Sequence, residues 1–99
     1  MAQANKTPSW LTVGTEFVTV RLTKPIEANG VKVDTMKLRA PTVRDIRSAQ
    51  AGAEDEEQRE LGLFASLAEV SVKELEGMAL KDYTRLQTGY FRLVQDDEL

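Results

Sequence analysis

The sequence contains neither cysteine nor histidine. Without cysteine, the chain has no disulfide bond and no thiolate ligand for a metal. Without histidine, it lacks the commonest general base and the commonest zinc ligand. A serine nucleophile needs a base beside it, and no glycine-rich phosphate loop is present either. We therefore expect no enzyme activity, no cofactor and no metal site.

Long apolar runs and an excess of positive charge are missing as well. No apolar run approaches the roughly 20 residues of a membrane-spanning helix, and the first residues lack the pattern of a secretory signal. The formal net charge is −3, and the lysines and arginines are spread along the chain. A nucleic-acid-binding protein gains much of its affinity by neutralising phosphates. We expect a soluble cytoplasmic protein with no membrane and no nucleic-acid partner.

The 99 residues are enough for one domain. Residues 1–15, with Pro8 and Gly14 as breakers, are predicted to be a flexible leader. Residues 16–94 are predicted to form a single α+β domain, and the acidic residues 95–99 a disordered tail. Trp10 in the leader either packs onto the edge of the domain or anchors a partner, since tryptophan is favoured at binding hot spots.

An antiparallel β-hairpin is predicted over residues 16–39. Val18, Val20 and Leu22 alternate with polar residues, as in a strand with one buried face. Asn29-Gly30 then indicates a type I′ turn, because both residues tolerate positive φ.

This turn sets the pairing of the two strands. It places Ile26 opposite Val33 and Glu27 opposite Lys32. The apolar positions change from odd to even numbers further along the second strand. We therefore predict a β-bulge near Asp34-Thr35.

Three to four α-helices are predicted after the hairpin, because apolar residues recur at three- and four-residue steps. The predicted helices span approximately residues 43–51, 54–69, 72–76 and 80–94. Capping boxes of Thr42 with Asp45 and of Ser71 with Glu74 mark two helix starts. In the last helix, the residues predicted to face inward are Leu80, Tyr83, Leu86, Tyr90, Leu93 and Val94.

Two clusters of charge have more than one interpretation. The acidic residues 54–57 fit the first turn of a helix, where the helix dipole favours them, and show no calcium-loop spacing. Arg44 and Arg47 project together near Lys37 and Arg39. They form either a solvated basic flank or a docking patch for an acidic partner segment.

An ordered set of four segments resembles the tail assembly chaperones of Mu-like and related contractile-tailed phages. The resemblance covers roughly residues 17–91. The segments are Lys24-Pro25-Ile26, Asn29-Gly30, Leu38-Arg39-x-Pro41-Thr42-Val43-x-Asp45 and Leu80-x-Asp82-Tyr83-x-x-Leu86-Gln87.

The resemblance implies a chaperone that transiently binds the long, largely helical tape-measure protein during tail assembly in the host bacterial cytoplasm. Many members of the family also exist in a frameshift-extended form, which is a second expected partner. Helix-in-groove binding makes Phe64, Leu67, Tyr90 and Phe91 candidate contacts. The alternative for each of the four is a place in the core. Self-association through the hairpin edge or the last helix would make the protein a homo-oligomer.

Two other functions remain open at this point. The helices at 43–51 and 54–69 are close enough to suggest a helix-turn-helix DNA-binding regulator. The acidic residues 54–57 would then lie where phosphates approach, which argues against it. The second is a structural minor component of the tail.

Overall fold

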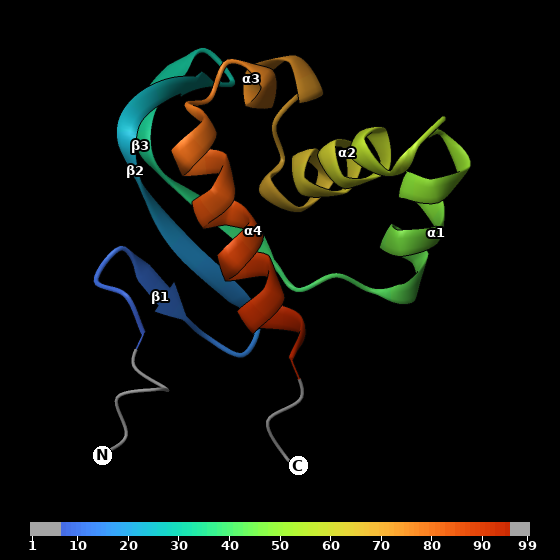
Figure 1. Ribbon diagram of the computed structural model, residues 1–99, viewed down its shortest axis with the longest axis horizontal. Helices are drawn as coiled ribbons and strands as arrows, with labels where there is room; N and C mark the ends of the chain where they lie inside the picture. The colour runs from blue at the N-terminus through green and yellow to red at the C-terminus, as the bar shows by residue number, and fades with distance from the viewer. Residues whose placement is uncertain (1–6, 96–99) are drawn as a thin grey trace.

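The computed structural model describes residues 7–95, which form a three-stranded antiparallel sheet followed by four helices (Figure 1). The predicted α+β fold is confirmed. The strands are β1 (Leu11–Val13), β2 (Phe17–Ala28) and β3 (Val31–Arg39), in the order β1-β2-β3. The helices are α1 (Val43–Ala51), α2 (Glu56–Ala68), α3 (Val72–Glu76) and α4 (Leu80–Val94).

One face of the sheet is covered by helices, and the core lies between the two layers. Helix α4 crosses the sheet over β2, and α2 packs against β3 (Figure 1). Helix α1 packs on α2 at the periphery and buries none of its residues. The most deeply buried apolar side chains are Val18, Val20, Leu38, Leu63, Phe64, Leu67, Leu75 and Leu86.

The turn of the hairpin and its pairing are as predicted. Asn29 and Gly30 have φ angles of 56° and 83°, which is the backbone that a type I′ turn needs. Ile26 pairs with Val33 and Glu27 with Lys32. The hairpin register could therefore be read from the turn residues.

The predicted bulge exists, but it lies in the other strand. Arg21 pairs with Thr35 and Ile26 with Val33, so residues 22–25 of β2 lie opposite Asp34 alone. The extra residues are in β2 and not at Asp34-Thr35. Pro25 has no N–H to donate to the β-sheet. At the bulge, β2 therefore loses fewer hydrogen bonds than a strand without proline would.

The bulge is held by Asp82 of α4. Its Oδ1 accepts a hydrogen bond from the Thr23 N–H (2.9 Å), and its Oδ2 accepts bonds from the Lys24 N–H (3.1 Å) and the Thr23 hydroxyl (3.1 Å). Asp82 has no exposed surface. Burial raises the pKa of this carboxyl, but the hydrogen bonds outweigh burial and bring the pKa below its usual value. A helix carboxylate thus replaces the acceptors that the sheet has lost.

The predicted leader over residues 1–15 is wrong at residues 11–13, which form β1. Leu11 pairs with Val20 and is buried. Burial of the Leu11 side chain depends on the glycine at position 89 of α4. A Cβ at this position would lie 3.2 Å from Leu11 Cδ1 and 3.1 Å from Val20 Cγ2. Because glycine carries no side chain, α4 approaches the sheet closely enough to enclose Leu11.

Smaller differences concern the ends of the predicted elements. Helix α2 begins at Glu56 and ends at Ala68 rather than spanning 54–69, because the Asp55 side chain caps it by accepting from the Gln58 N–H. Both predicted capping boxes are present. Of the predicted leader and tail, residues 1–6 and 96–99 lie outside the described residues.

We expect Asp82→Ala to lower the free energy of unfolding by about 2–4 kcal/mol, because it removes three hydrogen bonds to a charged acceptor at a buried position. Urea denaturation at neutral pH measures this loss. Asp34→Ala is the matched control, since Asp34 is an exposed aspartate opposite the same bulge. Its expected change is within about 0.5 kcal/mol. Equal losses in the two variants would contradict the role of Asp82.

A pair of glycine substitutions tests the close approach of α4. Gly62→Ala in α2 should raise the free energy of unfolding by about 0.5–1 kcal/mol, since a Cβ there meets no atom within 4 Å. Gly89→Ala should lower it, because its Cβ presses on buried Leu11 and Val20. Thermal or urea unfolding compares them. Stabilisation by both substitutions would show that the sheet does not need a glycine at position 89.

Candidate functional site

The most exposed apolar surface on a long helix is the outer side of α4, which lies in front of the sheet in Figure 1. Its inner side is fixed by Asp82, Leu86 and Gly89, which are buried. The residues of the outer side follow one another at steps of four, three, four and three, and all are exposed. We name them the α4 face: Leu80, Thr84, Gln87, Phe91 and Val94.

The three apolar members of the α4 face are unusually open to solvent. Leu80 is 80% exposed, Phe91 63% and Val94 45%. Single exposed apolar residues are common on protein surfaces, but these three share one side of a helix, with Thr84 and Gln87 between Leu80 and Phe91. Steps of four and three residues are those at which one helix packs along another. The α4 face therefore has the geometry to receive a helix over a length of about 20 Å.

The side of the α4 face next to α2 is fixed by an aromatic and polar cluster. The Phe64 ring lies 5.6 Å from the Tyr83 ring and 5.2 Å from the Tyr90 ring, between centroids. Glu60 Oε1 accepts hydrogen bonds from the Tyr83 hydroxyl and from Gln87 Nε2, both 2.8 Å. Burial, followed by this bond to Glu60, raises the pKa of Tyr83. Gln87 is thus oriented before any partner arrives.

The candidate contacts named from the sequence separate into different regions. Phe64 and Leu67 are in the core, with 0% and 2% exposure, and their side chains are not on the surface. Phe91 is on the α4 face, and Tyr90 is half-buried at its edge. Trp10 is half-buried on the far side of α4, where the Arg85 guanidinium lies 4.9 Å from its ring centroid.

The apolar spacing predicts Leu80 and Val94 on the inner side of the last helix, and this prediction is wrong. Both are exposed, whereas Leu86 of the same predicted stripe is fully buried. Helical spacing alone could not separate the sides, because α4 carries apolar residues on two of them. The buried residues Asp82, Leu86 and Gly89 follow the same four–three spacing, so the two sides are distinguished only by the contacts of Asp82 and Gly89 with the sheet.

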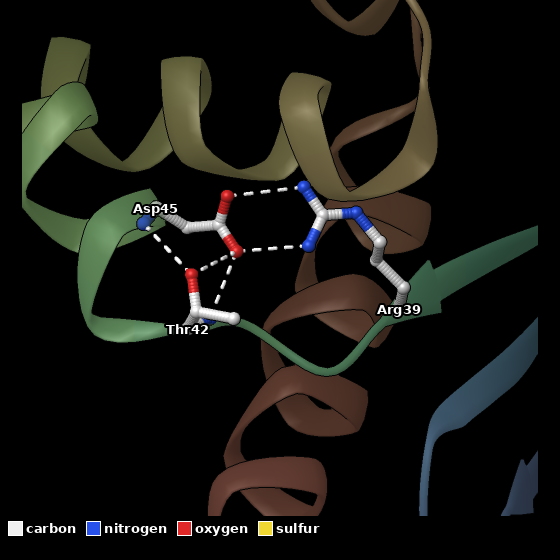
Figure 2. Close-up of polar contacts among 3 residues, drawn as sticks. All are labelled: Arg39, Thr42 and Asp45. Atoms are coloured by element: carbon white, nitrogen blue, oxygen red, sulfur yellow. Dashed lines mark hydrogen bonds and ion pairs between the residues drawn. The ribbon is translucent and has the colours of Figure 1, made fainter.

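The basic residues near α1 do not form one patch. Arg39 makes a two-pronged ion pair with Asp45 (2.8 and 3.0 Å), whose Oδ2 also accepts from the Thr42 N–H (2.8 Å), as Figure 2 shows. The Arg39 guanidinium, followed by that N–H, brings the pKa of Asp45 far below its usual value. Arg44 and Arg47 are exposed on the outer surface of α1. Arg39 is therefore part of the fold at the start of α1, which leaves Arg44 and Arg47 as the exposed pair.

A cleft of about 430 Å³ opens between α1, α2 and α3. It is lined mainly by small and polar residues, among them Ser48, Ala49, Gly62 and Ser66. No group of three acidic residues within residues 7–95 is arranged to hold a metal ion. Over the same residues, every helix is too short or too polar to cross a membrane.

The stability of the fold should fall in acid. Hydrogen bonds lower the pKa of Asp45, Glu74 and Asp82 in the folded chain from the usual 3.8, 4.5 and 3.8. Their contribution is complete above those values and is lost as the pH falls below them, because the unfolded chain binds protons first. Urea unfolding between about pH 7 and about pH 3 measures the loss. Asp45→Asn should be less stable at neutral pH and lose less in acid; a flat profile for the wild type would contradict this assignment.

Residues 19–95 match the family described as "phage tail assembly chaperone proteins, E, or 41 or 14". The match runs from within β2 to the end of α4, which is most of the chain, and β1 precedes it. No curated protein and no solved structure gives a match. The family match agrees with the resemblance of the four segments, and the chain belongs to the phage tail assembly chaperone family.

Proposed function

We propose that this chain transiently binds the tape-measure protein of its phage during tail assembly, and that the α4 face is the contact surface. The observation that carries the proposal is the solvent exposure of Leu80, Phe91 and Val94 along one side of α4. Family membership supports the chaperone role. The proposed site is the host bacterial cytoplasm, and the role requires binding without catalysis.

The geometry of the α4 face fits a helical partner. Its five residues form a straight row with apolar side chains at both ends and Thr84 and Gln87 between them. A helix of the tape-measure protein would bury Leu80, Phe91 and Val94 by packing along α4. Such a contact is small compared with a permanent interface. A small contact suits a protein that must release its partner when the tail tube forms.

Other candidate contacts lie outside the α4 face. Tyr90 borders it, and its ring is held against Phe64, so Tyr90 is proposed as a rigid edge of the contact. Arg44 and Arg47 on α1 are proposed to meet an acidic segment of the same partner or of the frameshift-extended form. Trp10 is proposed as an accessory anchor, although its ring already lies against Arg85.

Two alternatives are less well supported. For a helix-turn-helix regulator, α2 would be the recognition helix, but Asp55, Glu56 and Glu57 lie at its start. These carboxylates would repel DNA phosphates. A structural minor component of the tail would use the same α4 face permanently.

Co-expression with the tape-measure protein of the same phage tests the proposal. We expect the two proteins to co-purify, and the double variant Leu80→Glu, Phe91→Glu to bind at least about tenfold more weakly, because charges replace the apolar contact. Val31→Glu is the control, since Val31 is 61% exposed on β3, away from α4. Circular dichroism checks that both variants fold.

Three outcomes count against the proposal. Absence of co-purification with the wild-type chain would overturn it. An equal loss of binding in the Val31 control and the α4 double variant would overturn the assignment of the surface. Stoichiometric presence of the chain in purified phage particles would instead support a structural component.

A further inference from the structure

The α4 face has a basic border on one side. Lys81, Arg85 and Arg92 follow one another at steps of four and seven residues, so they form a row along the helix. Arg85 Nη1 donates to the Arg21 carbonyl oxygen (2.6 Å), and Arg92 Nη2 to the Thr7 hydroxyl (3.3 Å). These partners are neutral. Among residues 7–95, no carboxylate forms a salt bridge with any of the three. The buried Asp82 carboxylate lies near enough to Arg85 to interact with its charge, so these four residues together carry a net positive charge.

The opposite border of the α4 face is acidic and belongs to α2. Glu60 is placed there by its bonds to Tyr83 and Gln87 of α4. Glu57 lies three residues before Glu60 on α2, so both are on the same side of that helix. Glu56 is neutralised by Arg59 (2.7 Å). Glu57 and Glu60 therefore leave a net negative charge along this side, and Figure 1 shows α4 between β1 and α2.

We propose that the α4 face accepts a partner helix with acidic side chains along one border and basic side chains along the other, and that these two rows fix the direction in which the helix lies. This inference rests on the proposed function and gives the chemistry of the segment that is bound. The basic row of Lys81, Arg85 and Arg92 faces the acidic row of the partner. Glu57 and Glu60 face its basic row.

The rule for direction follows from helix geometry. In heptad notation, Leu80, Gln87 and Val94 take position d, and Thr84 and Phe91 take position a. Lys81 is then at position e, which carries the charge rule, whereas Arg85 and Arg92 are at position b, beside e and further from the partner. Tyr83, beside Glu60, is at position g. An antiparallel partner places its e positions against the e positions of α4, whereas a parallel partner places its g positions there. A partner with acidic e and basic g positions therefore binds antiparallel, and the reverse pattern binds parallel.

A second copy of this chain fits the α4 face less well than such a partner. In an antiparallel pair of α4 helices, the basic row would face its own copy, and Glu57 and Glu60 would face theirs. Facing like charges disfavours this pairing. A parallel pair avoids the repulsion, but it would occupy the surface that the tape-measure segment requires.

Two designed peptides test the inference on the full chain. Each has about three heptads with leucine at a and d; one carries glutamate at e and lysine at g, and the other the reverse. Because the chain has no cysteine, a Gln95→Cys variant takes a single label just beyond α4. Peptides labelled at either end then report their direction by energy transfer. We expect the N-terminal end of the first peptide, and the C-terminal end of the second, to lie near residue 95.

Charge variants give the second measurement. Lys81→Glu and Glu57→Lys should each weaken binding of the first peptide about two- to fivefold at low salt, and less at about 1 M salt. Both side chains are exposed, and neither makes a side-chain hydrogen bond or a salt bridge within the described residues. Lys32→Glu on β3, an exposed lysine away from α4, is the matched control and should leave the affinity unchanged.

The outcomes separate this inference from the proposed function. One shared direction for both peptides, or no binding of either by a chain that still binds the tape-measure protein through the α4 face, overturns the charge rule alone. A dimer in sedimentation that the Leu80→Glu, Phe91→Glu variant dissociates also overturns it, because a second copy then covers the surface. Failure of the chain to co-purify with the tape-measure protein overturns the proposed function itself.

Discussion

The hydrogen bonds of Asp82 to the bulge of β2 are the constraint on which the arrangement of this fold depends. They join residues 59 positions apart in the sequence. A buried carboxylate with its acceptors satisfied favours one position of the helix, because any shift of α4 along β2 would leave a charge without partners. The bond therefore fixes which side of α4 faces the sheet. The apolar row from Leu80 to Val94 is left outside as a consequence.

The segments that identified the family are explained mostly by such structural bonds. Lys24 and Pro25 belong to the bulge, and Ile26 follows it. Asp82 accepts hydrogen bonds from the backbone of the bulge. Arg39, Thr42 and Asp45 fix the start of α1 (Figure 2). Tyr83 and Gln87 both bind Glu60. Within these segments, Leu80 and Val43 are apolar and exposed, so they are the residues that the fold does not account for.

Features set by neighbouring residues could be predicted from the sequence, and features set by distant contacts could not. The turn at Asn29-Gly30 fixes the register of the hairpin, and the caps at Thr42 and Ser71 mark two helix starts, because each needs only a few adjacent residues. The hydrogen bonds that hold the bulge of β2 come from Asp82, far away in the sequence. Strand β1 exists because Gly89 leaves room for Leu11. On the candidate surface, the sequence predicts Phe91 as a contact but predicts Leu80 and Val94 on the buried side of their helix, where they do not lie.

The position of β1 ahead of the family match has a practical consequence for anyone who shortens this protein. A fragment cut where the match begins, at residue 19, would lose buried Val18, the residues that pair with Thr19 and Val20, and the Leu11 side chain that packs beside Gly89. It would present a bare strand edge next to an unfilled apolar hollow, which is a combination that promotes aggregation. Insolubility of such a fragment would then result from the truncation and would not be a property of the native chaperone.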